Sequence, residues 1–445
     1  MSFYDDYKKK LTTPEEAVKI VKDGDWVDYN FGFGMPQLLD DALAKRKGQL
    51  KDVKVRAYLA MDKIQVVEQD PEQESFTYYS WFCSGIERKY SDRGLCVFSP
   101  MTFRNLPSYY RRGYATVNVA MLCVTPMDKH GYFNVSGINA SSRSMLEAAD
   151  KIILEVNENM PWVYGGYDEV VHISEVDAVV EGPHGPLGEL KSPAPTETDE
   201  KIASYIMNEM VDGATLQLGI GGLPYAVGRN IAKSDLKDLG MHTEMMGDAY
   251  VDMIEAGKIT NRKKKINRGK GVFGCALGTK KLFDLIDRNP ACVSYPIDYV
   301  NSPAVMAQLD NLITINGCIS VDLFGQTCAE SAGTRHISGS GGQLDFLTGA
   351  YDSPGGKNFI CMTSSYVDKK GVKHSRFVPK FNGDIVTDPR SQAFYLATEH
   401  GIVNLAGKSS WERTEMMISI ADPDFRDELI ADAEKLGIWK KSNKR

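Results

Sequence analysis

The 445-residue chain lacks the features that would place it in a membrane, outside the cell or on nucleic acid. No stretch approaches the roughly 20 apolar residues that a transmembrane helix needs. The first ten residues, MSFYDDYKKK, contain no apolar segment typical of a secretory signal. Basic residues are not in excess, because 52 Lys and Arg stand against 59 Asp and Glu, a net charge of −7. We therefore expect a cytoplasmic protein that binds neither membranes nor nucleic acid.

Cysteine and histidine are too scattered to indicate a disulfide framework or a zinc site. The eight cysteines include no Cys-x-x-Cys pair, and most have apolar neighbours, as Cys123 has in Leu122 and Val124. The seven histidines include no His-x-x-x-His pattern. We predict reduced, buried thiols and no metal site.

The chain does contain enough apolar residues for a large core, and its sequence contains an internal repeat. Apolar residues make up 42% of the chain, and its length predicts two or three domains. Near the start, a capping box at residues 13–16 opens a helix, and an alternating strand follows at 25–29. A glycine turn at 31–36 then leads into an amphipathic helix through 38–43.

The second half repeats this order. A helix over 202–210 precedes a strand at 214–218, a glycine turn at 219–224 and a helix through 226–231. Gly24 corresponds to Gly213 and Pro36 to Pro224, so the offsets are 189 and 188 residues. Two copies in the same order at a matching offset indicate two related α/β domains.

A linker composition marks the junction between these domains. Residues 182–198 carry four prolines and three glycines, so we predict domains at 1–190 and 196–445. Short apolar runs at 120–124, 151–156 and 359–362 are typical of buried strands. We therefore predict an α/β fold in which each domain has a mostly parallel sheet flanked by helices.

Both glycine turns lie between a strand and a helix, where backbone N–H groups can receive negative charge. Neither turn is a P-loop, and neither fits the Gly-x-Gly-x-x-Gly pattern, which disfavours a dinucleotide site. They are either tight turns or ligand loops. A denser glycine cluster at 338–346 leaves a similar choice, between close approach to a ligand or oxyanion and a bulge or flexible loop.

Four ionisable features leave alternatives open. Glu244 is flanked by methionines and small residues, so it is a general base, a metal ligand, a nucleophile or a solvated carboxylate. His242 has no Ser or Cys partner motif and is interpreted as structural. The basic run at 262–265, with Arg268 and Lys270, is interpreted as a solvated face rather than a phosphate patch. Lys369, which precedes Lys370, presents the same choice.

Taken together, these motifs resemble the acetyl-CoA hydrolase/CoA-transferase family. The resemblance rests on LGIGGLP at 218–224, HTEM at 242–245 and GSGGQLDF at 339–346. It extends in order over nearly the whole chain, through residues 24–29, 84–89, 155–161, 278–281 and 420–426. Within the family, the chain looks most like enzymes that transfer CoA from butyryl-CoA to acetate, and 4-hydroxybutyrate CoA-transferases are also similar.

The resemblance implies two CoA-transferase-type domains and a ping-pong reaction on Glu244. That residue falls on the family's catalytic glutamate, which forms an acyl anhydride and then a glutamyl-CoA thioester. A glutamate with a pKa near ~4.3 is ionised at neutral pH and needs no general base. Because a carboxylate is a weak nucleophile, N–H donors must stabilise the oxyanion, and the candidates are Gly221, Gly222, Gly341 and Gly342.

The resemblance also implies the binding partners. CoA thioesters are substrates, no cofactor is tightly bound, no metal is needed, and a homodimer or larger homo-oligomer is expected. The residues implied to bind CoA are Gly219, Ile220, Gly221, Gly222, Leu223, Ile319, Gly341, Gly342 and Lys369.

The first domain is expected to shape the acyl pocket. Phe31, Phe33 and Met35 suit a short apolar acyl group better than a hydroxylated one, since a buried hydroxyl without a partner is costly. The alternatives are a 4-hydroxybutyrate CoA-transferase, an acyl-CoA hydrolase on the same scaffold, and a ligand-binding module that kept the fold.

Overall fold

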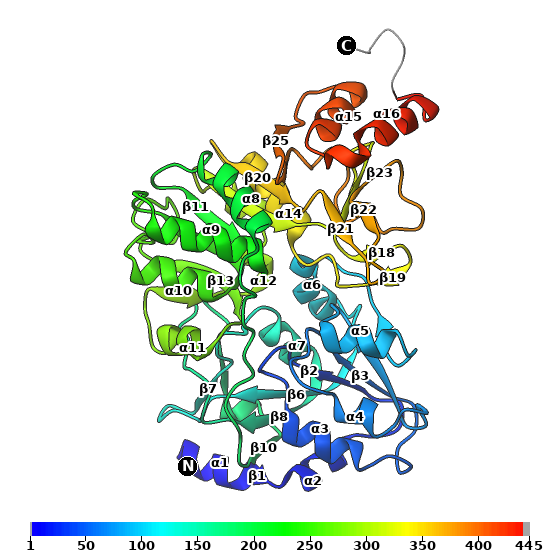
Figure 1. Ribbon diagram of the computed structural model, residues 1–445. Helices are drawn as coiled ribbons and strands as arrows, with labels where there is room; N and C mark the ends of the chain where they lie inside the picture. Colours follow the sequence, from blue (N-terminus) through cyan, green and yellow to red (C-terminus); the bar gives the residue numbers. More distant parts are fainter. Residues whose placement is uncertain (1, 439–445) are drawn as a thin grey trace. The chain divides into compact units, whose positions relative to one another are not determined.

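The computed structural model describes residues 2–438 (Figure 1). Its contacts divide the chain into two compact units. Among the described residues, the first unit contains 2–191, 244–246 and 270–300, and the second contains 192–243, 247–269 and 301–438. This division separates the chain near the predicted linker, but it also assigns two short stretches of the C-terminal half to the first unit.

The first unit is built on an eight-stranded sheet with the order β1-β10-β8-β6-β2-β3-β4-β5. Every neighbouring pair in this sheet is parallel. The strands are β1 (Leu11–Thr12), β2 (Trp26–Tyr29), β3 (Val53–Ala57), β4 (Phe76–Ser80), β5 (Val97–Phe98), β6 (Val117–Val124), β8 (Ala149–Val156) and β10 (Ala178–Glu181). A separate antiparallel pair joins β7 (Tyr132–Asn134) to β9 (Val170–His172).

Short helices connect these strands. They are α1 (Phe3–Lys10), α2 (Pro14–Ala17), α3 (Gln37–Ala44), α4 (Gln65–Glu68), α5 (Gly85–Ser91), α6 (Leu106–Arg111) and α7 (Ser142–Ala148), with 3₁₀ turns at Val18–Ile20, Phe103–Asn105 and Ile173–Glu175. The predicted N-cap is confirmed, because the Thr13 side chain accepts a hydrogen bond from the Glu16 N–H. The α-helix is shorter than predicted, since it tightens into a 3₁₀ turn after Ala17.

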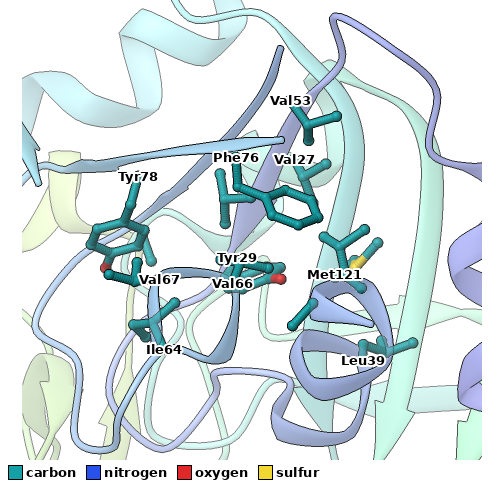
Figure 2. Packing of buried hydrophobic residues seen from close by; sticks show 14 of the residues in the cluster. Val27, Tyr29, Leu39, Val53, Ile64, Val66, Val67, Phe76, Tyr78 and Met121 are labelled. Carbon is teal, nitrogen blue, oxygen red and sulfur yellow. The ribbon is translucent and has the colours of Figure 1, made fainter. Parts of the chain in front are cut away.

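Helix α3 covers part of the sheet through an apolar face. Figure 2 shows Met121, from the central strand β6, between Leu39 of α3 and Val27 of the central strand β2. These three side chains are at most 1% exposed, and they belong to one continuous apolar cluster of the first unit. Burial on this scale fixes the register of β2, and with it the position of the glycine turn that follows.

The second sheet also has eight strands, in the order β14-β13-β12-β11-β15-β20-β24-β25. They are β11 (Thr215–Leu218), β12 (Gly240–Met246), β13 (Gly271–Ala276), β14 (Cys292–Ser294), β15 (Leu312–Gly317), β20 (Lys357–Cys361), β24 (Tyr395–Thr398) and β25 (Gly401–Asn404). The pairs from β12 through β24 are parallel, and only the edge pair of β24 and β25 is antiparallel among those with a described register. The predicted mostly parallel α/β fold is therefore confirmed.

The helices of the C-terminal half are α8 (Glu197–Met207), α9 (Gly222–Lys233), α10 (Asp248–Glu255), α11 (Lys280–Ile286), α12 (Ile297–Val300), α13 (Pro303–Met306), α14 (Gln343–Asp352), α15 (Ser410–Ser419) and α16 (Arg426–Lys435), with a 3₁₀ turn at Pro423–Phe425. The small strands are β16 (Ser320–Asp322), β17 (Thr327–Cys328), β18 (Ser331–Ala332), β19 (Arg335–His336), β21 (Ser365–Val367), β22 (Lys373–Ser375) and β23 (Phe377–Val378). No helix within residues 2–438 is both long and apolar enough to cross a bilayer.

The two sheets share one topological feature. In the first sheet the strand order reverses at β2, whose neighbours are β3 and β6. In the second it reverses at β11, whose neighbours are β12 and β15. Ligands in open α/β sheets bind outside the carboxyl ends of the strands at such a switch point. Each glycine turn recognised in the sequence directly follows one of these two strands.

Candidate active site

The second glycine turn is held at the carboxyl end of β11. The Gly219 N–H donates to the Ile315 carbonyl at 2.9 Å, which continues the pairing of β11 with β15. Gly221 then adopts φ +122° and ψ −176°, a conformation that is essentially restricted to glycine. It is the N-cap of α9, so Gly222 and Leu223 occupy the first turn of that helix. The unpaired N–H groups at the start of a helix favour negative charge.

Ile319 follows the neighbouring strand β15 and therefore lies at the same edge of the sheet as this turn. Residues Leu218 and Ile315 are direct partners in the parallel pair. The backbone of Ile319 is fixed on both sides, because its N–H donates to the Cys328 carbonyl at 2.7 Å and its carbonyl accepts from Arg376 at 2.9 Å. The structure thus brings residues 219–223 and Ile319 to adjacent strand ends.

The denser glycine cluster is an ordered helix start rather than a bulge. Gly341 has φ +54°, and Gly342 is the N-cap of α14. The first residue of α14, Gln343, donates to the buried Asp388 carboxylate at 2.7 Å, and Thr327 donates to the same oxygen at 2.6 Å. Burial raises the pKa of Asp388 to about 6. This carboxylate ties the start of α14 to β17.

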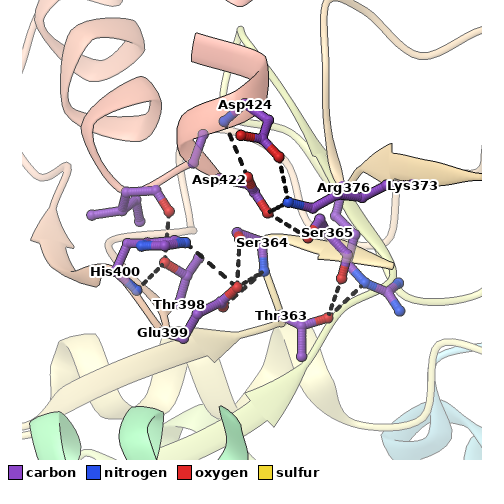
Figure 3. A network of polar contacts seen from close by, with 12 residues as sticks. Thr363, Ser364, Ser365, Lys373, Arg376, Thr398, Glu399, His400, Asp422 and Asp424 are labelled. Carbon is purple, nitrogen blue, oxygen red and sulfur yellow. Dashed lines mark hydrogen bonds and ion pairs between the residues drawn. The ribbon is translucent and has the colours of Figure 1, made fainter. Parts of the chain in front are cut away.

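Lys369 lies in a separate element, at the exposed tip of the antiparallel hairpin of β21 and β22. Figure 3 shows the polar network that fixes the base of this hairpin. Lys373 pairs with Asp422 at 2.7 Å and with Asp424 at 2.8 Å, while Ser365 donates to Asp422. Arg376, which also contacts the Ile319 carbonyl, donates to Thr363 at 3.0 Å. No described contact joins Lys369 itself to the glycine turns.

Glu244 lies near the end of β12 and is half-buried. Its backbone carbonyl accepts a weak hydrogen bond from the Cys275 thiol at 3.5 Å on β13. Burial raises the pKa of Cys275 well above its ordinary value, and the Glu244 charge adds to this effect. Gly274 is required beside it, because a Cβ at that position would stand 3.2 Å from the Glu244 carbonyl and 2.6 Å from Ile297. Cys275 is therefore a protonated neighbour.

The charge of Glu244 acts on Tyr58, which belongs to an aromatic cluster of the first unit. Burial, together with the charge of Glu244 and other groups, raises the pKa of Tyr58. The Tyr58 hydroxyl lies 2.8 Å from the Ser141 hydroxyl. Phe31, from the first glycine turn, stacks on the Tyr58 ring at 4.6 Å, and Phe103 meets both rings edge-on. The phenol is neutral and its apolar face is covered.

The other two apolar residues of the first turn are also buried. Phe33 is 7% exposed and meets Phe283 edge-on at 5.1 Å, while Met35 is 8% exposed. Gly32, between Phe31 and Phe33, approaches Leu277 so closely that a Cβ would lie 2.9 Å from a methyl carbon. The side chains of the first glycine turn are thus buried in apolar contacts.

A tyrosine that the sequence did not single out joins the ends of the two central strands of the second unit. The Leu218 N–H donates to the Tyr250 hydroxyl at 2.9 Å, and the same hydroxyl is hydrogen-bonded to Thr243. These are the residues immediately before Gly219 and Glu244. Tyr250, on α10, is 1% exposed. Its aromatic character gave no signal of this role, because the contact depends on how α10 packs.

The structure places two further features of the sequence, His242 and the basic run at 262–265. His242 is fully buried and packs against Phe346, with ring centroids 6.5 Å apart, as expected of a structural histidine. The basic run is a solvated face at Arg262 and Lys263, but Lys264 is only 4% exposed and donates to the Met241 carbonyl at 2.9 Å. Burial lowers the pKa of Lys264 to about 7. For Lys264 the sequence interpretation was wrong.

Two known family domains match parts of the chain. Residues 1–188 match the acetyl-CoA hydrolase/transferase N-terminal domain, and residues 278–433 match the acetyl-CoA hydrolase/transferase C-terminal domain. The chain is 49% identical to the butyryl-CoA:acetate CoA-transferase of Anaerostipes caccae, over 100% of both chains. It is 37% identical to the 4-hydroxybutyrate coenzyme A transferase of Clostridium kluyveri, over 98% of this chain and 100% of that one.

A solved structure is similar over the same length. RipA from Yersinia pestis superposes with a TM-score of 0.91 at 36% identity, covering 99% of this chain and 100% of that chain. The relatives and the solved structure therefore cover nearly the whole chain, and the two family domains together match well over half of it. The chain belongs to the acetyl-CoA hydrolase/transferase family.

Proposed function

We propose that this protein is a CoA-transferase that moves CoA from a short-chain acyl-CoA, butyryl-CoA foremost, to acetate. The end-to-end similarity to a butyryl-CoA:acetate CoA-transferase, at 49% identity, carries the proposal. The site supports it, because Glu244, a half-buried carboxylate, lies near the end of β12 in a chain of the acetyl-CoA hydrolase/transferase family. We further propose that the protein is cytoplasmic and forms homo-oligomers.

In the proposed reaction Glu244 is the nucleophile. Its carboxylate attacks the thioester carbonyl, the C–S bond breaks, and CoA leaves as a thiolate, which gives a mixed acyl-glutamyl anhydride. The thiolate then attacks the Glu244 carbonyl carbon, so that butyrate leaves and a glutamyl-CoA thioester remains. Acetate attacks this thioester and reverses both steps, which releases acetyl-CoA and regenerates the carboxylate. No proton is transferred, which explains why a general base is unnecessary.

The same proposal assigns oxyanion stabilisation to backbone N–H groups. Gly221 and Gly222 begin α9, and Gly341 and Gly342 lead into α14. Helix starts offer N–H groups without intrahelical partners, and each preorganised donor is worth about 3–4 kcal/mol at an oxyanion. Residues 219–223, Ile319 and Lys369 are proposed to contact CoA, whose remote parts supply binding energy that orients the thioester.

We propose that residues 1–190 shape the acyl pocket and 196–445 supply Glu244 and the CoA-binding loops. The buried aromatic surface around Phe31 and Tyr58 supports a short apolar acyl group. A hydroxylated acyl chain would have to find a partner for its hydroxyl, and the Tyr58 hydroxyl already contacts Ser141.

A transfer assay tests the proposal. Butyryl-CoA is incubated with and without acetate, and acetyl-CoA and free CoA are measured. We expect acetyl-CoA formation that depends on acetate, with little CoA release in its absence. CoA release that is independent of acetate would instead identify a hydrolase. Replacing acetate by propionate or 4-hydroxybutyrate measures acid selectivity, and a higher kcat/KM for 4-hydroxybutyrate than for butyrate would refute the apolar pocket.

A further inference from the structure

Three side chains that can ligate a metal meet in the first unit. Cys123 lies on β6 and Glu155 on β8, and they are direct partners in that parallel strand pair. His184 comes from the Gly/Pro-rich segment that follows β10. One donor atom of each residue, a thiol sulfur, a carboxylate oxygen and an imidazole nitrogen, lies within 4.8 Å of the other two. Their separation in sequence hides the cluster from any spacing rule.

Two of the three donor–donor distances in the cluster are close to those of a tetrahedral metal site. The Nε2 atom of His184 is 2.9 Å from Glu155 Oε1, and the Cys123 sulfur is 3.4 Å from the same oxygen. Zinc bonds of about 2.0–2.3 Å in tetrahedral geometry place N, O and S donors roughly 3.3–3.6 Å apart. The His184–Glu155 pair must therefore open by a few tenths of an ångström to admit the ion.

The surroundings of the cluster match those of metal ligands. The other carboxylate oxygen of Glu155 accepts the Leu39 N–H at 3.0 Å, which holds the side chain in place. The Cys123 thiol donates to the Met35 carbonyl at 3.3 Å, which holds the sulfur in place. All three side chains are almost fully buried, since Cys123 is 2% exposed and the side chains of Glu155 and His184 are 0% and 3% exposed.

The second ring nitrogen of His184 provides independent support. Its Nδ1 atom is buried without a hydrogen bond, and a carboxylate oxygen of Glu158 lies 3.7 Å away. A metal-bound histidine donates its other N–H to a carboxylate in most metal sites. Binding through Nε2 requires the ring proton on Nδ1, where it faces Glu158. An otherwise unsatisfied atom thereby gains a partner.

We propose that Cys123, Glu155 and His184 bind a borderline-soft divalent cation of the Zn²⁺ type. The thiolate and the carboxylate together neutralise the two positive charges, and the Cys123 proton is released to solvent on binding. The mixed sulfur, nitrogen and oxygen donor set disfavours Mg²⁺ and Ca²⁺, which prefer oxygen ligands. The ion is structural, because it fixes the segment around His184 to strands β6 and β8, and the proposal does not depend on the reaction at Glu244.

Metal titration of the full-length protein tests this site. The chelator-treated protein is titrated with Co²⁺, and thiolate ligation is followed by the charge-transfer absorption of the Co–S bond. Zn²⁺ retained after gel filtration is measured in parallel. We expect one equivalent of either metal per chain and a raised midpoint of thermal unfolding with Zn²⁺. No retained Zn²⁺ and no charge-transfer band would overturn the proposal.

Variants identify the ligands. Cys123→Ala and His184→Gln are each expected to abolish the charge-transfer band and to weaken Zn²⁺ retention at least tenfold. Cys292→Ala is the matched control, because Cys292 is equally buried, at 1% exposed, and belongs to the same unit. It should bind metal like the unmodified protein. Full binding by either ligand variant contradicts the three-residue site.

Discussion

At the scale of single residues, the hydroxyl of Tyr250 has more influence on the candidate site than its position in the sequence indicates. It is hydrogen-bonded to Leu218 and to Thr243, which directly precede the glycine turn and the proposed nucleophile. A single buried oxygen therefore sets how β11 and β12 end. Such a contact follows from packing of α10, and no local pattern predicts it.

Tyr250→Phe removes this oxygen and leaves the Leu218 N–H buried without its acceptor. An unsatisfied buried donor costs about 1–3 kcal/mol, so we expect a loss of that size in the free energy of unfolding. Urea denaturation measures it. Tyr351→Phe is the control, because Tyr351 is 63% exposed, and it should change stability by less than about 0.5 kcal/mol. If the two variants lowered the free energy of unfolding equally, the Tyr250 hydroxyl would have no specific role at the strand ends.

Lys264 gives the stability of the protein a defined pH dependence. Its folded-state pKa of about 7 is below the ordinary 10.5, so between these values the unfolded chain binds more protons and stability rises with pH. The Lys264→Met substitution removes this contribution to the pH dependence of stability. From pH 7 to pH 9 we expect the unmodified protein to gain about 2 kcal/mol relative to the variant. Denaturation at both pH values measures the difference, and a constant difference would show that Lys264 does not titrate.

At the scale of elements, the turn after β11 depends on a backbone conformation at Gly221 that essentially only glycine adopts. Gly221 has φ +122°, whereas Gly317, at the end of the adjacent β15, has no positive φ and room for a Cβ, whose nearest contact is 3.8 Å away. The glycine pattern was visible in the sequence, but the sequence did not show which of these glycines has a positive φ that excludes a side chain.

Gly221→Ala should therefore be costly and Gly317→Ala tolerated. A side chain in the Gly221 conformation costs about 1–3 kcal/mol, and relief of the strain must move the first N–H groups of α9. We expect lower stability and a KM for butyryl-CoA raised at least tenfold in Gly221→Ala. Steady-state kinetics and urea denaturation measure both. If Gly317→Ala showed the same rise in KM, the turn would have no specific part in CoA binding.

At the scale of the whole molecule, the sequence predicted the class of fold and several elements but not how distant residues come together. The repeat anticipated β2 and β11, which prove to be the strands at which the order of each sheet reverses. Hydrophobic periodicity reports which face of an element is buried, and it carries no information on strand order. The contacts of residues 244–246 with 270–300, and the meeting of Cys123, Glu155 and His184, depend on that order.

The proposed reaction requires Glu244 to act as a covalent nucleophile, and trapping its CoA thioester tests this most directly. The protein is incubated with butyryl-CoA without acetate, digested, and analysed by mass spectrometry alongside Glu244→Ala. We predict a CoA thioester on the peptide that contains Glu244, removed by acetate and absent from the variant, which should lose at least 1,000-fold in kcat. Glu72→Gln, a change to an exposed glutamate, should keep both the adduct and the turnover. No adduct in the unmodified protein, together with undiminished turnover in Glu244→Ala, would contradict the account.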